Sequence, residues 1–280
     1  MNTGLKDRVI LVTGASGGIG AATVRMLVKE EAKVIASGRN EDKLAQLAMD
    51  TGCDVLPFDL ESELSVKDAL SGIEVFGIVN CGGWGGEIAS PMETDLEVFD
   101  KVTSVNARGT LLVTKYASQG MIKAGLGGSI VNVSSQASLV GLAGHISYAS
   151  SKGAVDAMTR VSALELGKYD IRVNAVNPTV VMTPMSEWYW GRKDIGGPLL
   201  EAMPLTRWAI AELILPCCGG SCKESSLVAN FRSVSMSALS GASVMFGKSS
   251  SHNKLSTACI SLVPLVIAST ASWSGMMMQY

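Results

Sequence analysis

A glycine-rich turn between an apolar run and a helical pattern constrains the fold of this chain more than any other feature. The run Val9–Val12 is continuous and uncharged, as a strand buried on both faces should be. Helical periodicity follows from Ile19 to Glu30, and the turn between them reads Thr13-Gly-Ala-Ser-Gly-Gly-Ile-Gly20. This order lets the backbone approach a pyrophosphate, whose charge meets the free N–H groups at the start of the helix. A tight structural turn without a ligand is the alternative.

Strand-like and helix-like patterns then alternate along the chain. Further strands are expected at Val34–Ala36, Val55–Phe58, Val75–Val79, Ile130–Val133 and Arg172–Val176. Helical patterns separate them at about residues 41–49, 65–70, 95–124 and 148–166. This alternation predicts an α/β fold, a doubly wound parallel sheet covered by helices on both faces, which is the Rossmann fold.

The composition changes near Trp208. Residues 209–280 hold six charged side chains, sixteen serines and four of the six cysteines. We therefore divide the chain into a first part, residues 1–208, and a Ser/Cys-rich tail, residues 209–280, which we expect to be poorly ordered.

Charge and hydropathy exclude several classes of partner. The formal net charge of −2 argues against a nucleic-acid binder, which should show a basic excess. We expect no membrane span, because the longest uncharged stretch, Leu255–Ser274, is rich in Ser and Thr and contains Pro264. The polar N-terminus shows no secretory signature. Two cysteines in the first part, Cys53 and Cys81, suit a reducing compartment, so the expected location is the cytoplasm.

The end of the second expected strand indicates the cofactor. An acid there would hydrogen-bond the ribose 2′-hydroxyl of NAD and repel a 2′-phosphate. The sequence instead reads Ala36-Ser-Gly-Arg39, with no acid until Glu41. Because Ser37 and Arg39 offer a hydroxyl and a bidentate cation, we predict NADP(H). The alternative is that Arg39 is a solvated residue at a helix start.

A phenol and an ammonium lie four residues apart in Tyr148-Ala-Ser-Ser-Lys152, and hence on one face of a helix. An adjacent cation should lower the pKa of the tyrosine and bring it nearer to the range of efficient proton transfer. Ser135 follows an expected strand, where a parallel sheet presents residues to its ligand crevice. Asn106 is a polar residue inside a helical pattern, with no evident core role. A surface i,i+4 pair without a catalytic role is the alternative for Tyr148 and Lys152.

With these residues the chain resembles the short-chain dehydrogenases/reductases, which carry the Gly-x-x-x-Gly-x-Gly turn and an Asn–Ser–Tyr–Lys tetrad. The resemblance implies that Tyr148 gives a proton to the carbonyl oxygen while Ser135 polarises that oxygen. Lys152 would lower the tyrosine pKa and hold the nicotinamide ribose, and Asn106 would position a water of the proton relay. The implied cofactor contacts are Gly14, Ser16, Gly18, Ile19, Gly20, Ser37, Arg39, Asp59, Leu60, Asn80, Tyr148, Lys152, Val181 and Thr183.

Residues 1–208 resemble in particular the dicarbonyl/L-xylulose reductase branch, through the segments Ser129–Gln136, Ser147–Gly153 and Ile171–Thr183. The resemblance makes this part an NADP-binding catalytic domain. It implies a substrate pocket that holds a small sugar or dicarbonyl and is lined by Ser135, Gln136, His145 and Trp190. One departure is Asn80-Cys-Gly-Gly83, where the family has Asn-Asn-Ala-Gly.

The tail departs further from the family. It replaces the family's last helix and strand, which puts the family's homo-tetramer in doubt and leaves a sheet edge exposed. Three sulfurs in Cys217–Cys222 and the distant His252 lack paired metal-ligand spacing, so no metal site is expected. We interpret the tail as sequence from another reading frame or a retained intron.

Three functions compete at this point. The first is an NADPH-dependent carbonyl reductase of the L-xylulose-to-xylitol type. The second keeps the chemistry and changes the substrate to a 3-oxoacyl thioester or a steroid. The third is an inactive splice or frame variant that binds cofactor or parent subunits without turnover.

Overall fold

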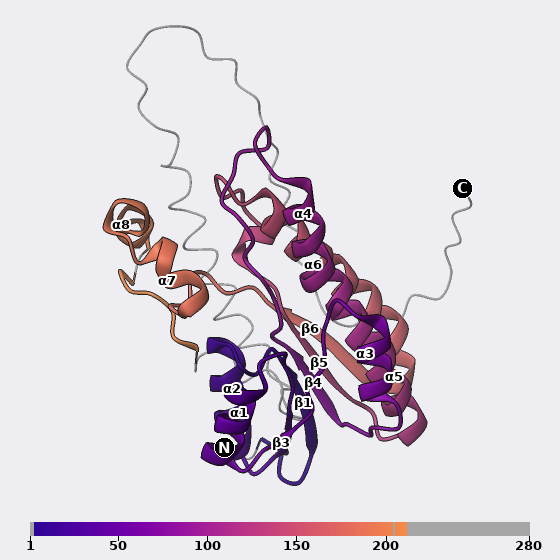
Figure 1. Ribbon diagram of the computed structural model, residues 1–280. Helices are drawn as coiled ribbons and strands as arrows, with labels where there is room; N and C mark the ends of the chain where they lie inside the picture. Colours follow the sequence, from indigo (N-terminus) through magenta and orange to yellow (C-terminus); the bar gives the residue numbers. More distant parts are fainter. Residues whose placement is uncertain (1–2, 204, 212–280) are drawn as a thin grey trace, which may run out of the picture. The chain divides into compact units, whose positions relative to one another are not determined.

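A parallel sheet of six strands organises the described part of the chain. The computed structural model describes residues 3–203 and 205–211, all within the first of two compact units, Met1–Met245. The strands are β1 (Val9–Thr13), β2 (Lys33–Ala36), β3 (Asp54–Val55), β4 (Gly77–Asn80), β5 (Gly128–Val133) and β6 (Ile171–Val176). They lie in the order β3-β2-β1-β4-β5-β6 (Figure 1). The predicted doubly wound parallel sheet is confirmed.

The order of the strands reverses between β1 and β4, which pair in parallel from Ile10 with Gly77 to Thr13 with Asn80. In open sheets of this kind, ligands bind beyond the carboxyl ends of the strands at the reversal point. The glycine turn follows β1 directly, so the fold brings it to that point.

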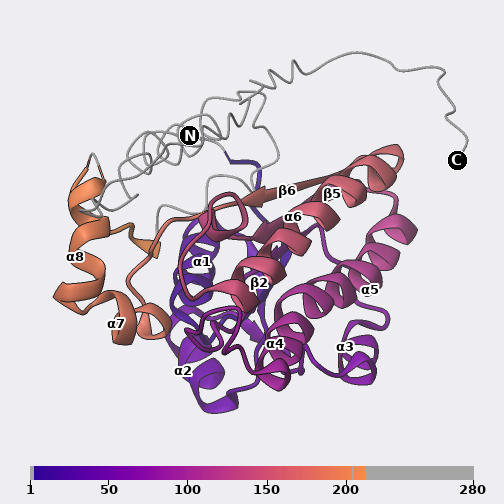
Figure 2. The ribbon, with the colours of Figure 1, turned by 90° about the horizontal axis from the view of Figure 1, so that it is seen from above.

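Helices cover both faces of the sheet (Figure 2). Residues such as Ile10 and Val12 pack against α1 (Gly18–Lys29) and α2 (Glu41–Thr51). Leu11 and Ile78 point to the other face and pack against α3 (Glu63–Leu70) and α5 (Gly109–Ala124). Helix α6 (Ile146–Leu166) lies on that second face too, and α4 (Leu96–Thr103) packs on it. Because residues on both sides of β1 pack against helices, the whole run Val9–Val12 is apolar.

The third expected strand is shorter than predicted. Val55–Phe58 was expected, whereas β3 is only Asp54–Val55, and its last bond to β2 runs from the N–H of Leu56 to the carbonyl of Ala36 at 3.0 Å. Pro57 follows and has no N–H to donate, so the ladder ends there.

The long helix expected over residues 95–124 is interrupted. A π-helical turn, Ser104–Arg108, separates α4 from α5, and Asn106 lies at its centre. Such turns insert an extra residue and occur often at functional sites. Two helices were not predicted at all, α7 (Pro184–Trp190) and α8 (Lys193–Ala202). The start of α7 has Pro184 in its first turn and a capping box between Thr183 and Ser186.

None of the described helices is long and apolar enough to cross a membrane. In the same part of the chain, Cys53 and Cys81 are free thiols. Of the tail, only residues 209–211 are described. The expectations about its disorder, its origin and its missing strand lie outside the described residues.

Candidate active site

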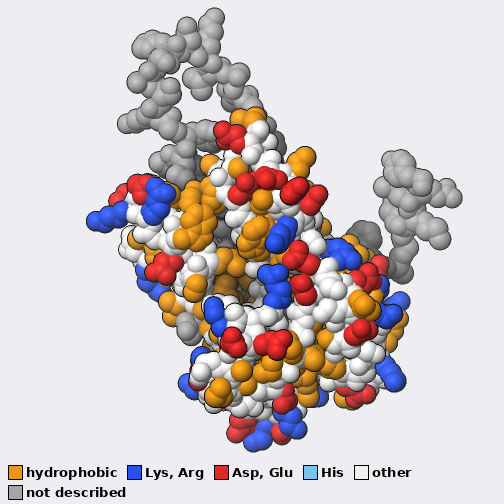
Figure 3. Space-filling model, in the orientation of Figure 1, with side chains coloured by type: hydrophobic (Ala, Val, Ile, Leu, Met, Phe, Trp, Pro, Cys, Tyr) orange, Lys and Arg blue, Asp and Glu red, His pale blue; other side chains and the backbone are white. Residues whose placement is uncertain are grey.

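A cleft of about 860 Å³ lies at the carboxyl ends of the strands and takes in the glycine turn after β1. The space-filling view shows a hollow on this side of the molecule, with hydrophobic side chains along its walls (Figure 3). Of the residues predicted for catalysis and binding, all but Asn80 and Asn106 line the cleft. The sheet therefore gathers residues from position 14 to position 190 into one space.

The glycine turn is packed so closely that side chains would not fit. Gly14 has φ +63°, and a Cβ there would lie 2.6 Å from the Cα of Gly82. A Cβ on Gly18 would lie 2.5 Å from Cγ2 of Thr183, which belongs to the cofactor residues expected from sequence. Helix α1 starts at Gly18 with no side-chain cap, so its first N–H groups remain available to an anion. The arrangement fits a pyrophosphate.

Near the glycine turn, the cleft is lined by a hydroxyl without a hydrogen-bond partner and by two cationic side chains. The Ser37 Oγ is buried and has no hydrogen-bond partner. Arg39 and Lys43 both line the cleft beside it. Arg39 also forms an ion pair with Glu61, at 3.2 Å between Nη1 and Oε2. The donor set fits a phosphate, which would have to compete with Glu61 for the guanidinium. Lys43 was missed by sequence reasoning, although it stands four residues beyond Arg39.

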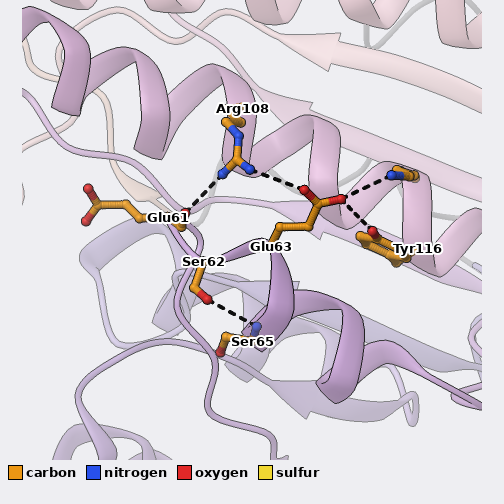
Figure 4. A network of polar contacts seen from close by, with 7 residues as sticks. Glu61, Ser62, Glu63, Ser65, Arg108 and Tyr116 are labelled. Atoms are coloured by element: carbon orange, nitrogen blue, oxygen red, sulfur yellow. Dashed lines mark hydrogen bonds and ion pairs between the residues drawn. The ribbon is translucent and has the colours of Figure 1, made fainter.

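A polar network fixes the loop that carries Asp59 and Leu60 to the helices behind it (Figure 4). Arg108 donates to the carbonyl of Glu61 at 3.0 Å and pairs with Glu63 at 3.4 Å. The Tyr116 hydroxyl donates to Glu63 at 2.6 Å, and this bond is the largest cause of the lowered pKa of that carboxyl. The network thus connects the loop that carries Asp59, Leu60 and Glu61 to α5 and to the π-helical turn.

Tyr148, Ser135 and Lys152 meet on one wall of the cleft. The Ser135 side chain lies close enough to the Tyr148 phenol to lower its pKa. The Lys152 Nζ lies 5.7 Å from the centroid of the Tyr148 ring and donates to the carbonyl of Val133 at 2.7 Å. Since β5 ends at Val133, the sheet itself orients the ammonium toward the phenol.

The direction of the tyrosine shift differs from the sequence prediction. We expected Lys152 to lower the pKa of Tyr148, but burial raises it, against a smaller lowering by the hydrogen bond with Ser135. Burial also lowers the pKa of Lys152 to about 8, while Cys81 and Asp156 act in the opposite direction. The prediction failed because Lys152 is buried and Tyr148 is partly buried, and desolvation is the largest cause of both pKa shifts.

A second layer holds Ser135 in place. The Ser138 hydroxyl donates to the carbonyl of Ser135 at 2.6 Å and also contacts Asp156. Asn177 donates to Asp156 at 2.9 Å and to the same carbonyl at 3.2 Å. Sequence reasoning missed Asp156, although it stands one helical turn beyond Lys152, on the same face of α6.

The side chains of Asn106 and Asn80 lie behind the cleft wall and contact protein groups. Asn106 accepts from the N–H of Trp84 at 2.7 Å and donates to the carbonyl of Trp84 at 2.9 Å. Its amide also donates to Ser151 at 2.9 Å. Asn80 donates to Asn132 at 2.9 Å. Their expected direct roles, at a relay water and at the cofactor, stay predictions.

The substrate end contains the predicted Gln136, His145 and Trp190. His145 stacks on Trp190 with centroids 5.6 Å apart, and its Nδ1 lies 2.7 Å from the carbonyl of Ala143. Further lining residues that sequence reasoning missed are Trp84, Ile88, Leu142, Met185, Trp188 and Tyr189. The aromatic run 188–190 was the signal that could have identified three residues of α7 together.

No group of three or more His, Cys, Asp or Glu side chains within residues 3–203 and 205–211 could hold a metal ion. The cluster Cys217–Cys222 and His252 lie outside the described residues.

Comparison with known proteins decides the family. The family model described as short chain dehydrogenase matches residues 8–192. The chain belongs to this family. The resemblance stated from sequence is therefore confirmed, and the protein is an oxidoreductase that acts on carbonyl or CH–OH groups.

Individual relatives agree with that assignment. The chain is 38% identical to L-xylulose reductase of Bos taurus over 216 residues, 77% of this chain and 88% of the relative. It is 36% identical to carbonyl reductase (NADPH) 2 of Sus scrofa over 203 residues, 72% of this chain and 83% of the relative. Among solved structures, a short-chain type dehydrogenase/reductase from Mycobacterium ulcerans superposes with a TM-score of 0.75 at 27% identity, covering 78% and 85% of the two chains.

Proposed function

We propose that this short-chain dehydrogenase is an NADPH-dependent reductase of small uncharged carbonyl compounds, either a sugar of the L-xylulose type or a dicarbonyl, acting in the cytoplasm. The observation that carries the proposal is one shared cleft. At one end it joins a proton donor, a polarising hydroxyl and an ammonium, and at the other a glycine cradle with two cations. The names of two relatives, L-xylulose reductase and carbonyl reductase (NADPH) 2, describe activity on such compounds.

NADP(H), when bound, supplies the hydride. The residues that would hold its pyrophosphate are the backbone groups of Gly14, Gly18 and Gly20, at the start of α1. Ser37 and Arg39 would hold the 2′-phosphate, with Lys43 as a further cation, and Asp59 and Leu60 would lie on the adenine side. Thr183 and Val181 would complete the opposite end.

The chain's own residues provide the proton and the polarisation. Ser135 donates a hydrogen bond to the substrate carbonyl oxygen, and Tyr148 transfers its phenolic proton to the same oxygen. Because burial raises the pKa of Tyr148, the phenol is protonated at neutral pH, as a proton donor in reduction must be. The charge on Lys152 then stabilises the phenolate that remains.

The test is oxidation of NADPH by the purified full chain with L-xylulose and 2,3-butanedione as separate substrates, each repeated with NADH. We expect turnover of at least one substrate, with kcat/KM for NADPH about tenfold or more above that for NADH, since one phosphate–guanidinium contact accounts for such a factor. Turnover preferring NADH would overturn the cofactor assignment. If the chain binds NADPH but reduces no carbonyl compound, the proposed reductase function is overturned and the inactive splice or frame variant is favoured.

A further inference from the structure

The segment of residues 178–183, which follows β6, forms one wall of the cleft. At its start, the carbonyl of Pro178 accepts from the N–H of Gln136, the neighbour of the polarising serine, at 2.9 Å. At its end, Thr183 packs against Gly18, where a Cβ would lie 2.5 Å from its Cγ2. This wall therefore connects the catalytic residues with the glycine cradle.

A second segment, residues 205–211, holds this wall from outside, and we call it the strap. Ala209 forms an isolated parallel bridge with Val181, and its N–H donates to the carbonyl of Val180 at 3.2 Å. Ala209 and Ala211 also pack against the core cluster that contains Val181. The composition of the chain changes near Trp208, so the first residues of the tail already contact the cleft wall.

Helix α1 leaves open space beside the strap. A groove of about 500 Å³ is lined by Ala21, Ala22 and Arg25 of α1 and by residues 182–184 and 208–211. Close packing is what fixes a segment in a protein interior, and a groove of this size interrupts it on the α1 side. The position of the strap therefore depends on the bridge to the cleft wall and on its contact with α8.

The indole of Trp208 makes the contact with α8. Gly196 is buried in that helix, and a Cβ on it would lie 3.1 Å from Cζ2 of Trp208. The same Cβ would overlap the carbonyl oxygen of Trp190 at the end of α7. Because Gly196 has no side chain, the half-buried indole and the end of α7 both approach α8 closely.

We propose that Trp208 is a positioning residue for the nicotinamide end of NADP(H). Its indole fixes the strap on α8, and the bridge from Ala209 then fixes Val180 and Val181. The wall to which these valines belong keeps Thr183 against the glycine cradle. Trp208 lies outside the lining of the main cleft, so it acts through this wall and not by touching the cofactor. The inference rests on the proposed function, which assigns this end of the cleft to that cofactor.

Without the indole, the wall would have to become ordered when the cofactor binds. Ordering a loop lowers the affinity for the part of a ligand that touches the loop. Adenosine 2′,5′-bisphosphate contains the adenine and the 2′-phosphate but no nicotinamide, so Ser37, Arg39 and Asp59 would hold it at the other end of the cleft. A comparison of this ligand with NADPH therefore separates positioning from general destabilisation.

The experiment measures the dissociation constants of NADPH and of adenosine 2′,5′-bisphosphate with the full chain by calorimetry. In Trp208→Ala we expect the constant for NADPH to rise about tenfold and the constant for the bisphosphate to stay within about twofold. Trp208→Phe keeps a ring against Gly196 and should retain most of the affinity. The nicotinamide fluorescence of bound NADPH should be enhanced less in Trp208→Ala than in the wild type, since the wall no longer immobilises that end.

A second variant tests the bridge without changing the indole. Ala209→Pro removes the N–H that donates to Val180 and should raise the same ratio of constants, even if Trp208→Ala does not fold. Leu205→Ala is the control, because it removes a side chain of the same strap that is 56% exposed, and it should change neither constant. A ratio unchanged in both Trp208→Ala and Ala209→Pro, or equal weakening of the two ligands, would overturn the inference.

Failure of the proposed function has a different signature. If the ratio changes as expected but the wild type reduces no carbonyl compound, the reductase function is overturned and the positioning role is supported. If the wild type binds NADPH no more tightly than the bisphosphate, the nicotinamide end contributes nothing to binding, so the positioning role is overturned and the 2′-phosphate site is supported. If the wild type binds neither ligand, both proposals are overturned.

Discussion

The side-chain amide of Asn106 holds both backbone polar groups of Trp84, with its oxygen 2.7 Å from the N–H nitrogen and its nitrogen 2.9 Å from the carbonyl oxygen. The same amide nitrogen donates to Ser151, whose hydroxyl donates to the carbonyl of Tyr148 at 2.7 Å. A residue expected to act on a relay water therefore connects the loop after β4 with the helix that carries Tyr148.

Asn106→Ala should weaken both the fold and catalysis. It leaves the N–H and the carbonyl of Trp84 unpaired at a partly buried site, which costs up to about 1–3 kcal/mol. We expect a matching loss in the free energy of unfolding by urea and a rise in KM for the carbonyl substrate. Asn174→Ala, a substitution at an exposed position on β6, is the control and should change neither. If Asn106→Ala keeps the wild-type stability and KM, the hydrogen bonds between Asn106 and Trp84 contribute neither to folding nor to substrate binding.

The buried ammonium of Lys152 should reduce stability at neutral pH. Its pKa falls from 10.5 to about 8 on folding because of burial, so the unfolded chain binds more protons between these values. Stability contributed by this group therefore rises as pH rises from about 8 to 10.5, and the penalty is fully present below 8. Lys152→Met should raise the free energy of unfolding at pH 7 by up to about 3 kcal/mol.

Urea unfolding of Lys152→Met and the wild type at pH 7 and pH 9.5 checks this sign. The difference between the two proteins should shrink at the higher pH. A difference that grows with pH would mean that folding raises the lysine pKa instead of lowering it. The activity of the wild type should decrease as the pH rises, because Lys152 loses its charge as the pH passes through about 8.

The ion pair between Arg39 and Glu61 should set the affinity for the 2′-phosphate. Arg39→Ala should raise KM for NADPH about tenfold and leave KM for NADH within a factor of two. Glu61→Gln should lower KM for NADPH, because it frees the guanidinium and removes a negative charge. Arg160→Ala, an exposed arginine outside the cleft, serves as the control. Equal effects of Arg39→Ala on both cofactors would contradict the assignment.

Asp156 should act as a positioning residue for Ser135. Asp156→Ala removes the acceptor of Ser138 and Asn177, both of which donate to the carbonyl of Ser135. We expect kcat to fall about tenfold or more with little change in KM for NADPH, because polarisation of the carbonyl needs Ser135 in register. Asp156→Asn keeps an acceptor and should recover part of kcat. Equal losses of NADPH affinity and kcat would indicate general unfolding instead.

The sequence predicted the architecture because periodicity and glycine spacing are local signals. The apolar run of β1 and the turn at Gly14 needed no tertiary information. The early end of β3, just before Pro57, was not predicted, although the missing N–H of proline is a local signal that could have indicated it. The π-helical turn around Asn106 was not predicted, and the contacts of Asn106 with the distant Trp84 are long-range contacts that a local pattern does not show.

The residues of the site were predicted better than their pKa shifts. Tyr148, Lys152 and Ser135 were identified from spacing and resemblance, and they meet in one cleft. The direction of the Tyr148 shift was wrong, because burial is a property of the packed molecule and spacing does not reveal it. Helix α7 was missed because it is short and begins with a proline, although its Trp190 was predicted to line the substrate pocket.

The central claim is that Tyr148 delivers the proton within a cleft that binds NADPH. The most direct measurement is steady-state oxidation of NADPH by Tyr148→Phe with saturating dicarbonyl, alongside calorimetric binding of NADPH to the same variant. The account predicts that kcat falls by at least about 100-fold, the range of general acid catalysis, while the dissociation constant of NADPH changes less than threefold. A variant that binds NADPH and keeps wild-type kcat would contradict it.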